Sequence, residues 1–412
     1  MSRLIELKEW QKPWAHRAQE TLQTSKGYVD TSRPGSGKTY VTCWNAQQVG
    51  ARLLIICPVI IESVWREMAI KYDVDIVDII GFEELRSVKN HTPKHGYLKR
   101  KDVITDGGIH QVSFSRTSKY MDLLAQGIIL VVDEIHKIKN DNAQYKAVRE
   151  MMGGIVLEDS CSRYALLSGT PFDKEEHVIN LLRLTGYVRH RNMYDIHPTT
   201  HDIVMLGLGE LIEGCKELDA ETTQATVEEH PLRTKHEVDI LAYQLYIKVI
   251  KARISGAMPA PVFPFDFDVK NGMYNICPEN IKALDRAVSS LAMATRYNET
   301  TNTVGKFGNG NMGAITLALK SIEYAKIDDM ARVAREMLNS DRNSKLVISL
   351  NYIQSMNKMV ELLVDYNPVV LNGEIKGALK RKEIVDKFQH DRHTRVIILI
   401  YLSTSQASIK IA

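Results

Sequence analysis

The chain has 412 residues, of which 44% are hydrophobic and 25% charged, values typical of a globular protein with two to three domains. Its formal net charge of +3 permits a nucleic-acid partner without requiring one. Five cysteines without a C-x-x-C pattern argue against a disulfide framework or a zinc site and favour a reducing compartment. No apolar run is long enough to predict a membrane span, and the charged N-terminus is not typical of a signal peptide.

Residues 4–22 carry apolar side chains at helical spacing and predict a helix that precedes a glycine-rich loop. Gln11 lies in this segment, and its amide offers a donor and an acceptor that suit the edge of an adenine. The alternative is a solvated surface glutamine, which residue type alone favours.

The glycine-rich loop, residues 32–39 with the sequence SRPGSGKT, stands between a predicted strand and a predicted helix. It matches the phosphate-loop pattern G-x-x-x-x-G-K-[ST] except at its first position, which is Ser32. Such a loop brings backbone N–H groups close to a phosphate, its lysine reaches the β- and γ-phosphates, and its hydroxyl binds Mg²⁺. A chance turn is the alternative. The predicted nucleotide-binding residues are Pro34, Gly35, Ser36, Gly37, Lys38 and Thr39.

Strand and helix patterns alternate after this loop, with strands predicted at 52–58 and 75–80 and a helix at 60–72. This alternation indicates a doubly wound α/β domain. Residues 89–119 interrupt it and are rich in Lys, Arg and His. They are either a basic loop that contacts a phosphate backbone or a solvated surface hairpin, and the second interpretation is slightly preferred.

A buried strand predicted for residues 127–132 ends in two carboxylates, Asp133 and Glu134. Beside a phosphate loop, the first would hold Mg²⁺ and the second would polarise the attacking water. His136 would connect this site to the next motif, and an ordinary strand-end turn is the alternative. A further strand leads into Ser168, Gly169 and Thr170, whose hydroxyls can bond the carboxylate motif.

The region from about residue 173 to 343 reads as mostly helical, with a polar stretch at 185–201 that contains several histidines. No metal-ligand spacing recurs there, so a metal cluster is disfavoured. Strands are predicted again at 345–350, 369–373 and 394–402, with helices at 352–365 and 381–390. These elements predict a second α/β unit.

Taken in order, SRPGSGKT, Cys57-Pro58, the DEIH of residues 133–136 and the SGTP of residues 168–171 resemble motifs I, Ia, II and III of superfamily 2 helicases and translocases. The segments 57–65 and 135–140 look most similar to the chromatin-remodelling branch, and closer still to helicase-like ATPases of large cytoplasmic DNA viruses. Gln11 resembles the adenine-reading element of this family, which reverses the preference stated above.

The resemblance implies two tandem RecA-like parallel-sheet lobes: lobe 1 at residues 1–190, a mostly helical insertion at 191–340, and a partial lobe 2 at 341–412. Thr404 stands where motif V is expected, without the usual glycines. Motif VI, with its arginines, is absent before residue 412. The expectation is a truncated or split motor, with an arginine from a partner protein or a weakened ATPase as the alternatives.

The implied activity is nucleic-acid-dependent ATP hydrolysis with Mg²⁺, coupled to translocation on or remodelling of duplex DNA, with DNA preferred to RNA. The implied catalytic residues are Lys38, Asp133, Glu134 and His136, and the implied metal ligands are Thr39 and Asp133. The implied coupling residues are Ser168, Gly169 and Thr170, and the implied nucleic-acid contacts are Cys57, Pro58 and Thr404.

A catalytically weak nucleic-acid-binding subunit of a split or truncated helicase, for example in viral transcription, is the alternative function. A metabolic phosphate-loop kinase is disfavoured, because it would lack the SGTP element and a second lobe. The expected location is the cytoplasm or a virion, with the nucleus left open, and no membrane partner is expected.

Overall fold

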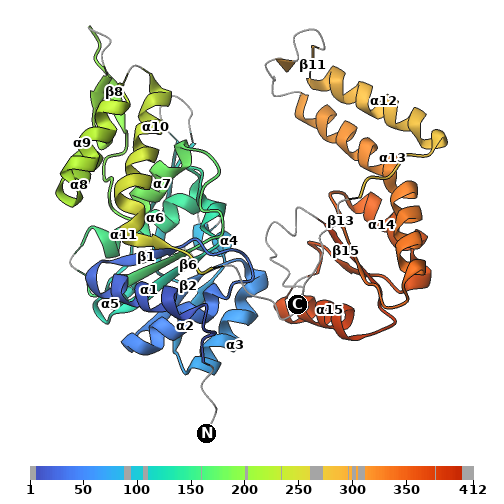
Figure 1. The fold of residues 1–412 in the computed structure, drawn as a ribbon, viewed down its shortest axis with the longest axis horizontal. Coiled ribbons are helices and arrows are strands. Elements are labelled where there is room, and N and C mark those ends of the chain that lie inside the picture. Colours follow the sequence, from blue (N-terminus) through green and yellow to red (C-terminus); the bar gives the residue numbers. More distant parts are fainter. Residues whose placement is uncertain are drawn as a thin grey trace. The chain divides into compact units, whose positions relative to one another are not determined.

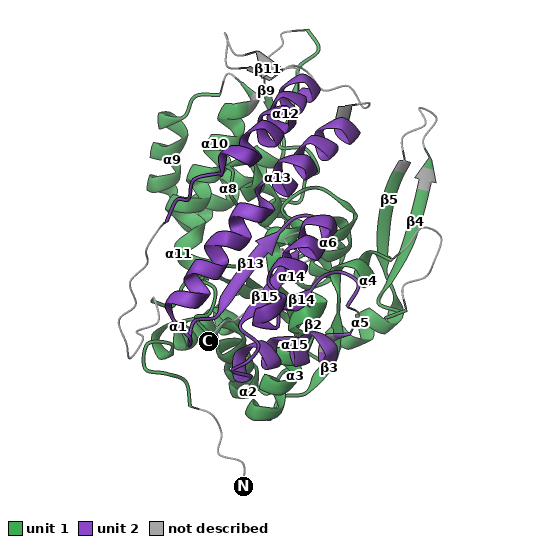
Figure 2. Cartoon of the chain, turned by 90° about the vertical axis from the view of Figure 1, so that its right-hand side faces the viewer, with its two compact units in different colours: residues 1–263 green, residues 264–412 purple. Residues whose placement is uncertain are grey.

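A computed structural model describes residues 6–87, 94–104, 110–158, 160–199, 203–232, 234–259, 272–295, 297–298, 303–304, 311–375 and 377–400. The chain divides into two compact units, residues 1–263 and residues 264–412, which are described separately (Figures 1 and 2). The division falls inside residues 191–340, so the first part of this region belongs to unit 1 and the rest to unit 2. The three-part functional scheme stays a prediction.

Unit 1 is built on a six-stranded, fully parallel sheet with the strand order β10-β1-β7-β6-β2-β3 (Figure 1). The strands are β1 (Gly27–Asp30), β2 (Arg52–Ile56), β3 (Ile76–Ile80), β6 (Ile128–Asp133), β7 (Arg163–Leu167) and β10 (Ser255–Gly256). Every residue of β1 and β6 is buried. Parallel strands covered on both faces have continuous apolar sequences, and the predicted α/β class is confirmed.

Helices cover both faces of this sheet. Leu53 and Ile55 pack on one face with the helices α1 (Lys12–Thr24), α2 (Lys38–Val49) and α3 (Glu62–Tyr72). Leu54 and Ile56 pack on the opposite face with the helices α5 (Ser118–Ala125), α6 (Ala143–Val156), α7 (Glu176–Leu184), α8 (Gly207–Leu218) and α10 (Lys235–Leu245). Smaller helical elements are α4 (Phe82–Arg86), α9 (Ala220–Glu229), α11 (Lys251–Ile254), the 3₁₀ helices η1 (Val59–Ile61) and η2 (Ile135–Ile138), and the π-helix η3 (Tyr246–Ile250).

Two antiparallel hairpins lie outside the main sheet of unit 1. One is formed by β8 (Tyr194–Ile196) and β9 (Ile203–Met205), the other by β4 (Leu98–Ile104) and β5 (His110–Arg116). The second occupies the basic segment in which the strand and helix alternation is interrupted. Residues 88–93 and 105–109 of that segment lie outside the described residues.

Unit 2 contains a three-stranded parallel sheet with the order β13-β15-β14, which confirms its α/β class. The strands are β13 (Leu346–Leu350), β14 (Val369–Leu371) and β15 (Val396–Ile400), and a short hairpin is formed by β11 (Tyr297–Asn298) and β12 (Thr303–Val304). The helices are α12 (Pro278–Thr295), α13 (Asn311–Ser340), α14 (Ile353–Leu362), η4 (Val364–Tyr366) and α15 (Ala378–His390). Among the described helices of the chain, none is long and apolar enough to cross a membrane.

Candidate active site

Three motifs that are far apart in the sequence meet at one edge of the unit 1 sheet. The phosphate loop follows β1, the carboxylate motif follows β6, and the Ser-Gly-Thr turn follows β7, which pairs with both of those strands. Leu167 is in register with Asp30 on one side and with Asp133 on the other, so all three connections leave the sheet at the same level. The carboxyl edge of a parallel sheet is the usual position of a ligand site in α/β proteins.

The phosphate loop uses left-handed backbone at its two glycines, Gly35 (φ 80°) and Gly37 (φ 90°). Gly37 is the N-cap of α2, so the loop presents its N–H groups at a helix N-terminus, where an anion is favoured. A Cβ at position 37 would also lie 2.3 Å from the Gln11 amide nitrogen. The positive φ therefore favours glycine at position 37, and a larger residue would also displace the Gln11 amide from the Ser36 carbonyl.

Gln11 braces the phosphate loop from the start of α1. Its side-chain Nε2 donates to the Ser36 carbonyl (2.9 Å), and its Oε1 accepts from the Lys8 N–H (3.0 Å). The residue is buried. Both ends of the amide are thus engaged within the chain in this structure, and the adenine-reading role stays a prediction.

The Lys38 ammonium lies folded back into the phosphate loop. It donates to the Ser32 carbonyl (2.9 Å) and makes a longer contact with the Arg33 carbonyl (3.4 Å). Its charge also acts on Asp133, whose pKa it lowers against the larger opposing effect of burial. The ammonium therefore stands between the phosphate loop and the carboxylate motif, where phosphate oxygens could replace the two carbonyls.

Ser32, the departure from the phosphate-loop pattern, has structural partners of its own. Its backbone N–H donates to the Asp30 carboxylate (2.9 Å), and its hydroxyl accepts from the Met258 N–H (2.8 Å). Asp30 also accepts a hydrogen bond from the Trp14 indole (2.9 Å), and its burial raises the pKa of its carboxyl. The serine hydroxyl thus ties the phosphate loop to the segment that follows β10, 226 residues away.

Restoring the consensus glycine with Ser32→Gly is expected to destabilise the chain by about 1 kcal/mol, because the buried Met258 N–H loses its acceptor. The free energy of unfolding, measured by urea denaturation, checks this. Ser32→Ala is the matched variant, since it removes the same acceptor without adding backbone freedom. A Ser32→Gly chain as stable as the unchanged protein would show that the hydroxyl has no structural role.

Asp133 is held by the indole of Trp65, which lies on α3 and is fully buried. The Trp65 Nε1 donates to Oδ2 of Asp133 at 3.0 Å. Burial, together with the neighbouring Glu134 charge, raises the pKa of Asp133 to about 7. The carboxyl is consequently poised to release a proton when a cation binds beside it.

Glu134, His136 and Ser168 form a connected group across two strands. Glu134 adopts a left-handed backbone (φ 63°, ψ 52°) at the start of η2, a conformation that is strained for a residue with a Cβ. The His136 Nδ1 lies 3.1 Å from Oε2 of Glu134 and 3.1 Å from the Ser168 hydroxyl. The Ser168 hydroxyl also accepts from the Thr170 N–H (3.2 Å). A movement of the carboxylate motif would therefore displace the Ser-Gly-Thr turn through these contacts.

The same turn contacts the phosphate loop directly. The Ser168 N–H donates to the Asp30 carbonyl at 3.0 Å. A Cβ added at Gly169 would lie 2.9 Å from Cδ of Pro34, so only glycine fits here without movement of the loop. The Ser-Gly-Thr turn is thus packed against both motifs that it is predicted to couple.

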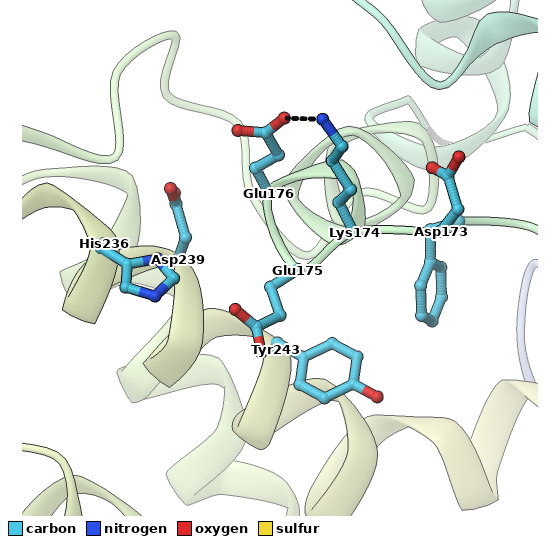
Figure 3. A pocket seen from close by; sticks show the side chains of 8 residues that line it. Asp173, Lys174, Glu175, Glu176, His236, Asp239 and Tyr243 are labelled. Atoms are coloured by element: carbon cyan, nitrogen blue, oxygen red, sulfur yellow. Dashed lines mark ion pairs between the residues drawn. The ribbon is translucent and has the colours of Figure 1, made fainter. Parts of the chain in front are cut away.

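A further link joins the region after the carboxylate motif to the region after the turn. Lys139, just past η2, forms an ion pair with Asp173, which lowers the pKa of that carboxyl to about 2. Asp173 also contacts Nδ1 of His177 at 2.7 Å. Asp173 also lines a cavity of about 560 Å³ between the 172–176 segment and α10 (Figure 3). Lys174 and Glu176 face each other at its rim, 3.9 Å apart.

The oxygen donors at this edge fit Mg²⁺. Thr39 contributes a hydroxyl at the start of α2 and Asp133 a carboxylate, which are the hard ligands this cation prefers. Among the described residues there is no group of three or more His, Cys, Asp or Glu that could hold a metal by itself. A nucleotide-dependent Mg²⁺ site needs few protein ligands, because phosphate and water supply the others.

Not all predicted site residues lie in this group. Cys57 and Pro58 follow β2 at the same sheet edge, but both are buried, and burial raises the pKa of the Cys57 thiol. A nucleic-acid contact at these positions would have to come from the backbone, and the assignment stays a prediction. Thr404 lies outside the described residues.

Sequence reasoning missed Trp14, Asp30 and Trp65 as supports of the site. The available signal was that a buried tryptophan usually finds an acceptor for its N–H, and each of the two indoles found a strand-end aspartate.

The chain was compared with known proteins at three levels. No family model matches it. A protein of Acanthamoeba polyphaga mimivirus named "Putative ATP-dependent RNA helicase L364" is 25% identical over 121 residues, which are 28% of this chain and 22% of that protein. The chain thus matches only about a fifth of the length of this relative. The match agrees with the resemblance to superfamily 2 helicases that the motifs carry.

Solved structures similar to the chain include the SWI2/SNF2 ATPase core of Sulfolobus solfataricus in complex with dsDNA, with 15% identity and a TM-score of 0.36. That match covers 97% of this chain and 79% of the other. The Hef helicase domain of Pyrococcus furiosus has 14% identity and a TM-score of 0.33, and the match covers 96% and 86%. These scores are too low to transfer residue roles, which are argued from this chain alone.

Proposed function

We propose that this chain is a nucleic-acid-dependent ATPase that couples ATP hydrolysis to movement on, or remodelling of, duplex DNA. The observation that carries the proposal is the packing of the Ser-Gly-Thr turn between the phosphate loop and the carboxylate motif. The turn bonds to Asp30 on one side and to His136 on the other.

The roles follow from the contacts. The loop N–H groups and the Lys38 ammonium would hold the phosphates, the ammonium giving up its two carbonyl partners as it does so. Mg²⁺ at Thr39 and Asp133 would neutralise phosphate charge. Glu134 would orient the attacking water.

Release of the γ-phosphate would change the contact with nucleic acid through the Ser-Gly-Thr turn. Glu134 contacts His136, and His136 contacts Ser168, so reorientation of the glutamate changes the position of the turn. DNA is preferred to RNA as the partner, and a protein that supplies an arginine stays a prediction. A cytoplasmic location is likewise proposed from cysteine usage, and a virion location from the resemblance to viral ATPases, with the nucleus left open.

The test is phosphate release by the full chain with Mg-ATP, measured in single turnover with and without duplex DNA. We expect stimulation by DNA and its loss in Lys38→Ala, because the lysine of a phosphate loop reaches the β- and γ-phosphates. Lys71→Ala, an exposed lysine on α3 paired with Glu67, is the control for general effects of charge removal. The absence of any Lys38-dependent hydrolysis, even with DNA present, would refute the proposal and favour the weak nucleic-acid-binding subunit.

A further inference from the structure

The β4–β5 hairpin is a two-stranded ribbon that pairs with no other strand of the described chain. It projects from unit 1 (Figure 2). Its register places Lys99 opposite Ser115 and Lys101 opposite Ser113. Because side chains alternate along a strand, these four residues share one face of the ribbon.

The two faces of this ribbon differ in whether their charged side chains are paired within the chain or exposed to solvent. On the inner face, Arg100 forms a bidentate pair with Asp102 (2.8 and 2.9 Å) and also donates to the carbonyl of Arg86 at the end of α4 (3.1 Å). Phe114 on that face is buried in the core. The Arg100 guanidinium is therefore engaged within the chain, where it attaches the ribbon to the rest of unit 1.

On the outer face, the described side chains are Lys99, Lys101, Gln111, Ser113 and Ser115, and all are exposed. This set, called here the ribbon face, contains two cations and three hydrogen-bonding groups and no carboxylate. Lysines two residues apart on a strand are separated by about 7 Å, comparable to neighbouring phosphates along one nucleic-acid strand. Its charge is complementary to a polyanion, and its hydroxyls and amide are typical phosphate-contacting groups.

We propose that the ribbon face binds the phosphate backbone of duplex DNA, outside the motor motifs. A two-stranded β-ribbon fits the major groove of B-form DNA, whereas the major groove of A-form RNA is too deep and narrow for it. The ribbon would lie along the groove while Lys99 and Lys101 neutralise phosphates at its edge. This inference rests on the proposed function in that nucleic acid is the ligand, but it assigns a surface that no motif assigns.

The ribbon lies between α4 and α5 in the chain, so it is separate in sequence from the residues proposed to hold ATP. Arg100 fixes the base of the ribbon to α4, which begins at the carboxyl end of β3. DNA held on the ribbon face would therefore be bound to the same compact unit that carries the nucleotide edge. The ribbon face would raise affinity for DNA without entering the chemistry.

The experiment measures binding of the full chain to a short fluorescent DNA duplex over a salt series, for the unchanged protein and for Lys99→Gln/Lys101→Gln. Losing two phosphate contacts is expected to weaken binding by about tenfold or more at moderate salt and to flatten the log–log salt slope by about two. The matched control is Lys216→Gln/Lys251→Gln, which removes the same charge from α8 and α11. ATP hydrolysis without DNA should be the same in all three proteins.

The possible results separate the two proposals. If the unchanged chain binds DNA and both double variants bind equally well, the ribbon face is wrong and the proposed function stands. If both double variants lose affinity alike, the effect is one of net charge, and the ribbon face is again wrong. If the unchanged chain neither binds DNA nor is stimulated by it, the ribbon-face proposal and the proposed function are both refuted. An RNA duplex of the same sequence bound more tightly than DNA, with the same dependence on the two lysines, would overturn the assignment to DNA.

Discussion

Replacing Glu134 with glutamine is expected to slow ATP hydrolysis by about 10²- to 10⁴-fold while changing ATP affinity by less than about threefold. Glutamine has nearly the same shape but cannot accept a proton from water. Glu134 lies beside the proposed phosphate site rather than within the loop that would hold the phosphates. The measurement is single-turnover phosphate release together with equilibrium binding of a fluorescent ATP analogue.

The backbone at Glu134 makes this variant a sharp test. A left-handed φ of 63° costs free energy in a residue with a side chain, on the order of 1 kcal/mol or more, and such strain persists where the surrounding structure determines it. Glutamine bears the same strain, so any loss of hydrolysis cannot be attributed to backbone relaxation. The control is Glu67→Gln on α3, an exposed glutamate that pairs with Lys71.

Two results would contradict the role of Glu134. Hydrolysis that survives in Glu134→Gln at more than about a tenth of the normal rate would show that another group orients the water. A parallel loss of ATP binding would show that the carboxylate acts on the phosphates or on the loop. The first result would move the catalytic assignment toward His136, which contacts both Glu134 and Ser168.

The convergence of the motifs could be predicted from the sequence, because it depends on local patterns. Apolar runs at 52–56 and 128–132 predict buried parallel strands, and parallel strands place whatever follows them at one edge. Gly35 and Gly37 predict the turn, since both positions need a positive φ.

The supports of the site could not be predicted, because they depend on contacts between distant parts of the chain. Trp65 and Asp133 are 68 residues apart, and Ser32 and Met258 are 226 apart. The edge strand β10 has only two residues and no recognisable strand pattern, yet it pairs with β1, and Met258, two residues after it, donates to the Ser32 hydroxyl of the phosphate loop.

Replacing Asp133 with asparagine is expected to have two opposite effects. It should abolish Mg²⁺-dependent hydrolysis, because an amide is a poor ligand for this cation. It should also make the nucleotide-free chain more stable above neutral pH. The Trp65 indole keeps an acceptor in the variant, since the asparagine side-chain oxygen can take the place of the carboxylate oxygen.

The sign of the stability effect follows from the raised pKa. The carboxyl of Asp133 has a pKa of about 7 in the folded chain and 3.8 as its ordinary value. Between these pH values the folded chain holds a proton that the unfolded chain has lost, so stability falls as pH rises through this window. Below about pH 4 the penalty is absent, and above about pH 7 it is complete, on the order of a few kcal/mol.

Unfolding by urea in the presence of a chelator, at several pH values between about 4 and 8, checks this. The gain in free energy of unfolding for Asp133→Asn should be near zero at the acidic end and grow steadily through pH 7. Asp122→Asn, which replaces an exposed aspartate on α5, is the control for the removal of a carboxylate. A gain that does not depend on pH would show that burial beside Glu134 does not raise the pKa of the Asp133 carboxyl, and the expected pH dependence would be wrong.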